Sequence, residues 1–391
     1  MSIEIRPLRE DERDTMVALS SQAFNVAPSR IREAPSWPAE LARGAVVDGE
    51  LVAMLRTHQM GHYFGGRAVP SVGIGGVAVA GHARGKRVAE TMMIETLREF
   101  RETHPISMLY PATVPLYRRC GYEYAAYRFQ FKAPLDGLPR VTGGPDVTPW
   151  TPDDQADVEA CYRRWAATTS GVVDRPAWWW RDRILHESKD QPLYRYVVRE
   201  NGDVTGYTIY TQEKHGEMAW GFDIECRDLV WLTPAAGAAL LAFAGRNRST
   251  GVNLLWAGSP NDALANLLPE QDAEHFFSFR QMLRLIDVAA AFEARGFPMS
   301  LEAAVELQVQ DPAFGWNDAG WRIDVSGGAA KVAQAPGARA RIEVGTLGAL
   351  YSGMLSAKDA RRLGTLDAND DEVATLDAML AGPAPFVNDW F

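Results

Sequence analysis

A glycine-rich strand that leads directly into a basic turn and an amphipathic helix is the segment that most constrains the fold of this chain. Residues 72–79 read Val-Gly-Ile-Gly-Gly-Val-Ala-Val, which predicts a buried strand whose glycines leave the backbone open to close approach. Residues 84–87 then read Arg-Gly-Lys-Arg. A helical apolar stripe follows, with one row of Val88, Met92 and Thr96 and an adjacent row of Ala89, Met93, Leu97 and Phe100.

The turn between this strand and this helix suits an anionic ligand such as a pyrophosphate. The first N–H groups of a helix have no partner within the helix, and the helix dipole is positive at that end. Arg84, Lys86 and Arg87 add mobile cationic donors. A solvated basic turn at the surface is the plainer interpretation, because such turns are common.

The length of 391 residues predicts two or three domains. Polar–apolar alternation in residues 1–135 indicates an α/β domain, and glycine and proline at residues 136–145 indicate a linker. Residues 136–294 predict a helix from Pro152, strands near 195–199 and 205–211, and a strand–helix unit at 228–245. Residues 295–391 predict a helix near their start, strands around 321–325 and 340–344, and then further helices.

Composition narrows the class of protein. The net charge of −10 disfavours nucleic-acid binding and suits a cationic amine substrate, although an acidic surface that only maintains solubility explains it equally well. No apolar run is long enough for a membrane span, so neither a membrane partner nor a secretory signal is expected. Cys120, Cys161 and Cys226 lie far apart, which predicts a cytoplasmic protein with no disulfide and no metal site.

Two segments of the first region resemble the GCN5-related N-acetyltransferases. Residues 84–89 resemble the acetyl-CoA motif R/Q-x-x-G-x-G/A, with Arg87 where glycine is usual, and residues 116–122 resemble the family's final Tyr-x-x-x-Gly-Tyr/Phe element. The resemblance implies that Tyr117 is the general acid that protonates the departing thiolate. A core aromatic on a helix face is the structural alternative for Tyr117. The acetyl-CoA contacts implied by the resemblance are Val77, Ala78, Val79, Arg84, Gly85, Lys86, Arg87, Val88 and Ala89.

The order of the three regions extends this resemblance to the whole chain. Residues 320–325, 340–344 and 347–353 resemble a sterol-carrier-like fold. No basic glycine turn follows the strand at 228–234, so the middle region resembles a degenerate acetyltransferase domain without a second acetyl-CoA site. Two acetyltransferase-like domains, the second degenerate, and a sterol-carrier-like domain resemble the enhanced intracellular survival (Eis) family. That family acetylates multi-amine substrates, including aminoglycosides, and assembles as hexamers, so a homohexamer is expected here.

The end of the chain carries the proposed base. An amine must be neutral to attack a thioester, so a base assists the reaction. Phe391 supplies an ionised α-carboxylate, and the apolar ending of residues 385–391 argues against a frayed tail. The resemblance makes this carboxylate the general base, with Asp389 as the alternative. Phe24, Trp37 and Trp390 are the expected substrate contacts.

The sequence is also compatible with two other functions. The chain could bind a lipid or sterol through its third region while the first region is a remnant, or it could form a scaffold without catalysis. Arg84, Tyr117 and the apolar terminus favour the enzyme. The physiological acceptor amine cannot be read from the sequence.

Overall fold

The computed structural model describes residues 3–33, 38, 41–141, 143–188, 191–217 and 220–391. The chain forms two compact units. Unit 1 comprises Met1–Ala125, Arg280–Gly382 and Trp390–Phe391, and unit 2 comprises Ala126–Phe279 and Pro383–Asp389. The last nine residues are therefore divided between the two units.

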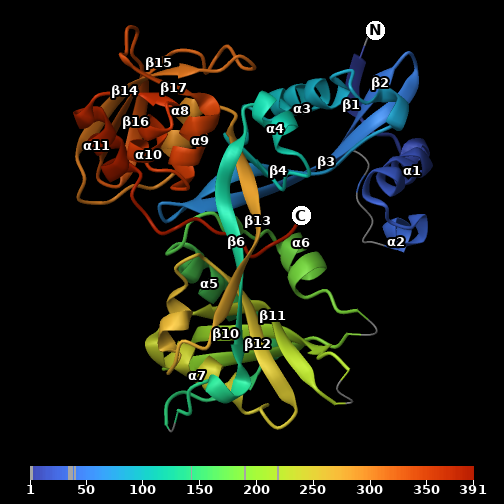
Figure 1. Cartoon of the computed structure of the whole chain (residues 1–391), viewed down its shortest axis with the longest axis vertical. Helices are drawn as coiled ribbons and strands as arrows, with labels where there is room; N and C mark the ends of the chain where they lie inside the picture. Colours follow the sequence, from blue (N-terminus) through green and yellow to red (C-terminus); the bar gives the residue numbers. More distant parts are fainter. Residues whose placement is uncertain (1–2, 34–37, 39–40, 142, 189–190, 218–219) are drawn as a thin grey trace. The chain divides into compact units, whose positions relative to one another are not determined.

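The N-terminal part of unit 1 is a mixed sheet with helices against it (Figure 1). The strand order is β1-β2-β3-β4-β5-β13, in which β4 and β5 are parallel and the other neighbours are antiparallel. The strands are β1 (Ile3–Pro7), β2 (Ala42–Val47), β3 (Glu50–Phe64), β4 (Arg67–Val79), β5 (Ile106–Leu109) and residues 280–285 of β13 (Glu274–Leu285). The helices are α1 (Arg13–Phe24), α2 (Pro28–Glu33), α3 (Val88–Glu99) and α4 (Val114–Arg119).

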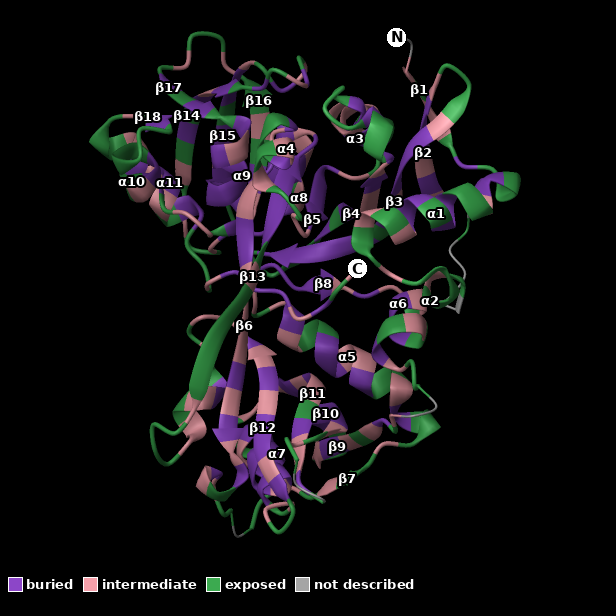
Figure 2. Ribbon diagram, turned by 45° about the vertical axis from the view of Figure 1, so that its right-hand side comes forward, coloured by how far each residue is buried: buried purple, intermediate pink, exposed green. Residues whose placement is uncertain are grey.

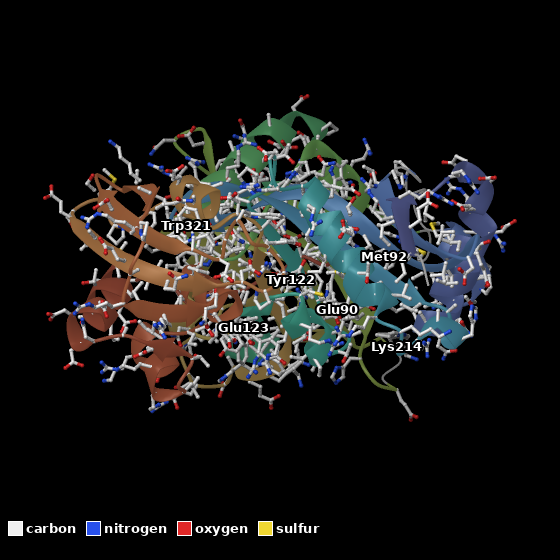
Figure 3. The ribbon with its side chains drawn as sticks, turned by 90° about the horizontal axis from the view of Figure 1, so that it is seen from above. Glu90, Met92, Tyr122, Glu123, Lys214 and Trp321 are labelled. Carbon is white, nitrogen blue, oxygen red and sulfur yellow. The ribbon has the colours of Figure 1, made fainter. Side chains whose placement is uncertain are left out.

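The amphipathic stripe predicted for residues 88–100 is confirmed. Helix α3 buries Val88, Met92, Met93, Thr96 and Leu97. Glu90 and Met92 lie on this helix in Figure 3, and Glu90 pairs with Arg119 of α4 at 2.9 Å. The stripe therefore packs α3 onto the sheet, and this ion pair fastens α4 to α3.

The C-terminal part of unit 1 is a five-stranded sheet in the order β16-β15-β14-β17-β18. Its strands are β14 (Ala303–Gln310), β15 (Gly320–Ser326), β16 (Ala329–Gln334), β17 (Ala340–Glu343) and β18 (Leu366–Asp367). Its helices are α8 (Val288–Ala294), α9 (Val344–Ser352), α10 (Ala357–Arg362) and α11 (Asp370–Met379). The strands predicted near 321–325 and 340–344 are confirmed.

The helix predicted at the start of this region is wrong. Helix α8 ends at Ala294, before the predicted position, and β14 follows. Val305, Leu307 and Val309 are buried and alternate with polar residues, which is the two-residue period of a strand with one buried face. This alternation of buried and polar side chains favours a strand more strongly than the helix-forming residues around it favour a helix.

One apolar core joins the two parts of unit 1. Phe64 of β3 and Ile106 of β5 lie in the same cluster as Leu307 of β14 and Tyr351 of α9. The rings of Phe64 and Tyr351 lie 5.3 Å apart in an edge-to-face arrangement. The sterol-carrier-like part thus packs on the acetyltransferase-like part as an element of the same unit.

The strands of unit 2 follow one another in the order β6-β12-β11-β10-β9-β7. Its strands are residues 126–134 of β6 (Glu123–Pro134), β7 (Val147–Pro149), β9 (Tyr194–Glu200), β10 (Asp203–Lys214), β11 (Phe222–Trp231), β12 (Gly251–Gly258) and residues 274–279 of β13, with the short β8 (Val173–Asp174). Its helices are α5 (Gln155–Ala166), α6 (Ala177–Trp179) and α7 (Pro234–Gly245). Strand β13 is exposed at its start and buried from Gln281 onward, as Figure 2 shows.

Candidate active site

Strand β4 separates from its neighbour β5 at the glycines. The parallel pairing ends at Ile74 and Leu109, whereas β4 continues to Val79. The register of β4 against β3 shifts by one residue beyond Gly75, and Gly76 adopts a left-handed φ of 61°. Residues 75–79 of β4 therefore extend past the last residue that pairs with β5.

The C-terminal residue lies against this strand. A Cβ placed on Gly73 would lie 2.8 Å from Cε2 of the Phe391 ring, and a Cβ placed on Gly75 would lie 3.5 Å from the Phe391 carboxyl carbon. The ring therefore covers Gly73, and the terminal carboxylate lies beside Gly75. The absence of a side chain at Gly73 makes this close approach sterically feasible.

Aromatic side chains surround Phe391. The ring of Tyr110, which directly follows β5, lies 4.8 Å from the Phe391 ring and also 4.8 Å from the Trp390 ring. The ring of His58, which pairs with Gly73 across β3 and β4, lies 5.4 Å from Phe391. Trp390 is 53% exposed, so the aromatic group reaches the surface at Trp390.

Tyr117 lies in α4 and is buried in a different packing layer. It belongs to the cluster that contains Val72 and Ile74, whose side chains alternate along β4 with Gly73 and Gly75. Burial raises the pKa of Tyr117 to about 12, with a smaller contribution from Cys120. No described side chain hydrogen-bonds to the Tyr117 hydroxyl, which leaves this proton donor available.

Tyr117 packs against Tyr122, which is itself held by a hydrogen bond to Ser107. The Tyr122 ring lies 6.2 Å from the Tyr117 ring, and the Tyr122 hydroxyl is 2.7 Å from Oγ of Ser107, which donates to the Val72 carbonyl. Burial raises the pKa of the Cys120 thiol to about 12, so the thiol stays protonated. Cys120 and Tyr122 are thus buried core residues.

The basic turn lies at the start of α3. Residues 84–87 are all exposed, and the guanidinium of Arg84 donates to the Val79 carbonyl at 3.2 Å. Arg87 is the N-cap of α3 with a left-handed φ of 57°, and its side chain does not cap the helix. The conformation explains why glycine is usual at this position, since a left-handed φ strains other residues. The start of α3 therefore lies beside three exposed cationic side chains.

Other predicted residues lie elsewhere. Phe24 ends α1 and is 45% exposed. Trp37 lies outside the described residues. Asp389 is buried in an ion pair with Arg175 of unit 2 at 3.0 Å, and burial raises its pKa. This pairing occupies the carboxylate that was the alternative base and so disfavours Asp389 in that role.

Three segments of the chain match known protein families. Residues 4–125 and 171–285 each match an acetyltransferase (GNAT) domain, and residues 288–388 match a sterol carrier protein domain. An uncharacterized N-acetyltransferase of Streptomyces avermitilis is 28% identical over 91% of both chains.

Solved structures of similar proteins cover the whole chain. A GCN5-related N-acetyltransferase from Anabaena variabilis has 27% identity and a TM-score of 0.93 over 100% of both chains. One from Kribbella flavida has 26% identity and a TM-score of 0.85 over 100% of this chain and 98% of its own. Eis1 from Mycobacterium abscessus, at 22% identity over 100% of both chains, shares the fold with a TM-score of 0.80.

The chain is an acetyltransferase with two GNAT domains, and it shares the fold of Eis1. It contains two GNAT domains and a C-terminal sterol-carrier-type domain, as the sequence predicted. None of the described helices is long and apolar enough to cross a membrane.

The second GNAT domain of this acetyltransferase has a different helix start. Thr233 caps α7 by accepting a hydrogen bond from the Ala236 N–H. The Thr233 hydroxyl donates to Glu200 at 2.5 Å, so a carboxylate lies beside the cap. A negative charge there opposes a pyrophosphate, in contrast to the three cations at α3.

Two residues of the aromatic group were not predicted as site residues. His58 reaches Phe391 only because β3 pairs with β4, and this pairing has no local sequence signature. Tyr110 carried a weak signal, because it directly follows a strand beside the splayed end of β4.

Proposed function

We propose that the protein transfers an acetyl group directly from acetyl-CoA to a primary amine of a small cationic multi-amine substrate, such as an aminoglycoside, a polyamine-like compound or a lysine amine. Tyr117 is the general acid, and the Phe391 carboxylate is the general base. The observation that carries the proposal is the position of the Phe391 carboxyl group beside Gly75, where β4 leaves its pairing with β5. No metal ion takes part in the proposed reaction.

Acetyl-CoA is proposed to bind along β4 and the following turn. The backbone of Val77, Ala78 and Val79 offers hydrogen-bonding groups to the pantetheine amides on the edge that β5 does not pair. The N–H groups at the start of α3, together with the exposed residues 84–87, receive the pyrophosphate.

The two catalytic groups serve different bonds. Phe391 lies on the face of Gly73 and Gly75, whereas Tyr117 packs with the side chains of the opposite face. With a thioester between them, the amine attacks the carbonyl carbon and gives its proton to the carboxylate. The C–S bond then breaks, and the Tyr117 hydroxyl donates its proton to the sulfur.

The surroundings of Phe391 suit an amine. Tyr110, Trp390 and Phe391 present aromatic rings, which attract a cation through their faces. The net charge of −10 adds a long-range attraction for a polycation.

Charge reversal at the turn tests the cofactor site. Arg84→Glu is expected to weaken acetyl-CoA binding at least 10-fold, because it places a negative charge beside the pyrophosphate. Arg163→Glu in unit 2 is the matched control, since Arg163 is also exposed and lies in the last turn of a helix. Isothermal titration with acetyl-CoA measures both, and equal losses would remove the turn from the site.

An amine panel tests the reaction itself. CoA release is measured with spermidine, an aminoglycoside, a lysine peptide and an aromatic monoamine, and mass spectrometry identifies the acetylated product. We expect turnover with at least one polyamine at a higher kcat/KM than with the monoamine. Acetyl-CoA binding without turnover of any amine would contradict the proposed function.

The assembly and location of the protein stay predictions. A homohexamer would give a light-scattering mass of six chains, and closed symmetry would be expected for it. A cytoplasmic location follows from the sequence composition alone.

A further inference from the structure

Unit 2 contains a fully buried ion cluster centred on Arg175. The guanidinium donates from Nη1 to Oδ2 of Asp228 at 2.6 Å and from Nη2 to Oδ1 of Asp228 at 3.2 Å. It also donates from Nε to Oδ2 of Asp389 at 3.2 Å and from Nη2 to Oδ1 of Asp389 at 3.0 Å. The cation also lies 3.9 Å from the centre of the Tyr162 ring. One guanidinium thus clamps a carboxylate of β11 and a carboxylate of the C-terminal segment.

Neutral groups complete the cluster. The Tyr207 hydroxyl donates to Asp228 at 2.6 Å, and the Trp179 indole N–H donates to Asp389 at 3.2 Å. The amide of Asn388 donates to Asp228 at 3.2 Å. Each carboxylate therefore has donors in addition to the shared arginine.

The backbone before Asp389 is held as well. The N–H of Phe386 donates to the Ser170 carbonyl at 2.9 Å, and the N–H of Val387 donates to the Tyr127 carbonyl at 2.9 Å. The Tyr127 N–H donates in return to the Pro385 carbonyl at 3.1 Å. The segment 385–389 is thus fixed on unit 2 by its main chain and by its side chains.

Stability alone does not account for such a cluster. Two carboxylates share one guanidinium away from water, and burying charges costs several kcal/mol per ion before pairing offsets it. Apolar side chains of similar volume fill such a space at lower cost. In addition to its energy, directional bidentate pairing fixes the geometry of the paired groups.

We infer that Arg175, with Asp228 and Trp179, positions the Phe391 carboxylate by holding Asp389. Two residues span at most about 7 Å, so a fixed Asp389 confines the terminal carboxylate to a small volume. The other end of this short segment is Phe391, whose ring lies on Gly73. The inference rests on the proposed function, because it assumes that this carboxylate is the base.

Asp389→Ala is the variant that tests this inference. It leaves Arg175 paired with Asp228 and so avoids an unpaired buried cation. We expect kcat to fall at least 10-fold with the acetyl-CoA Kd unchanged, because misplacement of a catalytic group by about 1 Å costs up to about 100-fold. Asp182→Ala is the matched control, since Asp182 also pairs with an arginine of unit 2 but lies outside the cluster.

Release of the C-terminal residue gives a readout that is independent of activity. Carboxypeptidase A removes exposed C-terminal phenylalanine, and mass spectrometry follows its loss. Asp389→Ala is expected to release Phe391 at least 10-fold faster than Asp182→Ala under conditions where both melt normally. Equal release rates would overturn the inference. Trp179→Phe removes only the indole donor to Asp389 and is expected to speed the release of Phe391 by a smaller factor. This variant tests the inference if Asp389→Ala does not fold.

A double variant separates this inference from the proposed function. In a chain extended beyond Phe391, the terminal carboxylate is already lost, so Asp389→Ala should lower kcat little further. Equal losses in the extended and native chains would show a structural role for Asp389 and overturn the inference. Full activity of the extended chain by itself would overturn Phe391 as the base, whatever Asp389 does.

Discussion

A chain extended by Gly-Ser-Gly-Ser after Phe391 is expected to lose about 100-fold or more in kcat while it retains acetyl-CoA binding. Extension converts the Phe391 carboxylate into a neutral amide, and general acid–base steps contribute about 10²–10⁴-fold. The carboxyl group lies beside Gly75, and the Phe391 ring lies on Gly73, so added residues also crowd this strand. Amine acetylation by the native and extended chains, with equilibrium titration of acetyl-CoA, measures the two effects separately.

Two further chains separate charge from position. A C-terminal amide made by ligation removes the charge and adds no residue, and it is expected to reproduce most of the loss. Deletion of Phe391 retains a carboxylate but withdraws it by about 3.3–3.6 Å, which exceeds the tolerance of a direct hydrogen bond. Thermal melts identify any loss of folding. An extended chain with native kcat would assign the base to another group, and the ion pair of Asp389 makes that residue unsuitable.

Local patterns predicted the strand, turn and helix of the proposed cofactor site. The glycines of β4, the basic turn and the stripe of α3 lie in one continuous segment of the sequence, and their periodicity reports burial directly. The cap of α7 by Thr233 follows from the same local logic. Such features are decided by neighbours in the chain, so one sequence suffices to find them.

The acceptor side depended on contacts that are distant in sequence. Phe391 meets His58 and Tyr110 through sheet pairing and the fold of the tail, and no spacing rule connects these three positions. Asp389 was the alternative base from the sequence, because its partner Arg175 lies 214 positions away and no local pattern indicates this ion pair. Strand β14 was mistaken for a helix because its alternation competes with helix-forming residues.

Tyr117→Phe is expected to lower kcat by about 10²–10⁴-fold and to leave acetyl-CoA affinity nearly unchanged. The substitution removes one hydroxyl and keeps the buried ring in its cluster. Because burial raises the pKa of Tyr117 to about 12, the phenol remains protonated as pH rises from 7 to 10. The loss in kcat should therefore be uniform over this range, and ionisation of Tyr117 should produce no alkaline decline in the native enzyme below pH 10.

Tyr122→Phe is the matched control for this prediction, since it removes a buried hydroxyl from the neighbouring ring. Tyr122 shares a hydrogen bond with Ser107, so its loss should cost about 1 kcal/mol of unfolding free energy. Its kcat should change far less than that of Tyr117→Phe, because the Tyr122 hydroxyl is already engaged in the core. Pre-steady-state measurement of CoA release establishes whether chemistry limits turnover in each protein. If chemistry is rate-limiting and Tyr117→Phe retains the native rate, Tyr117 has only a packing role, and the thiolate leaves without a proton from this side chain.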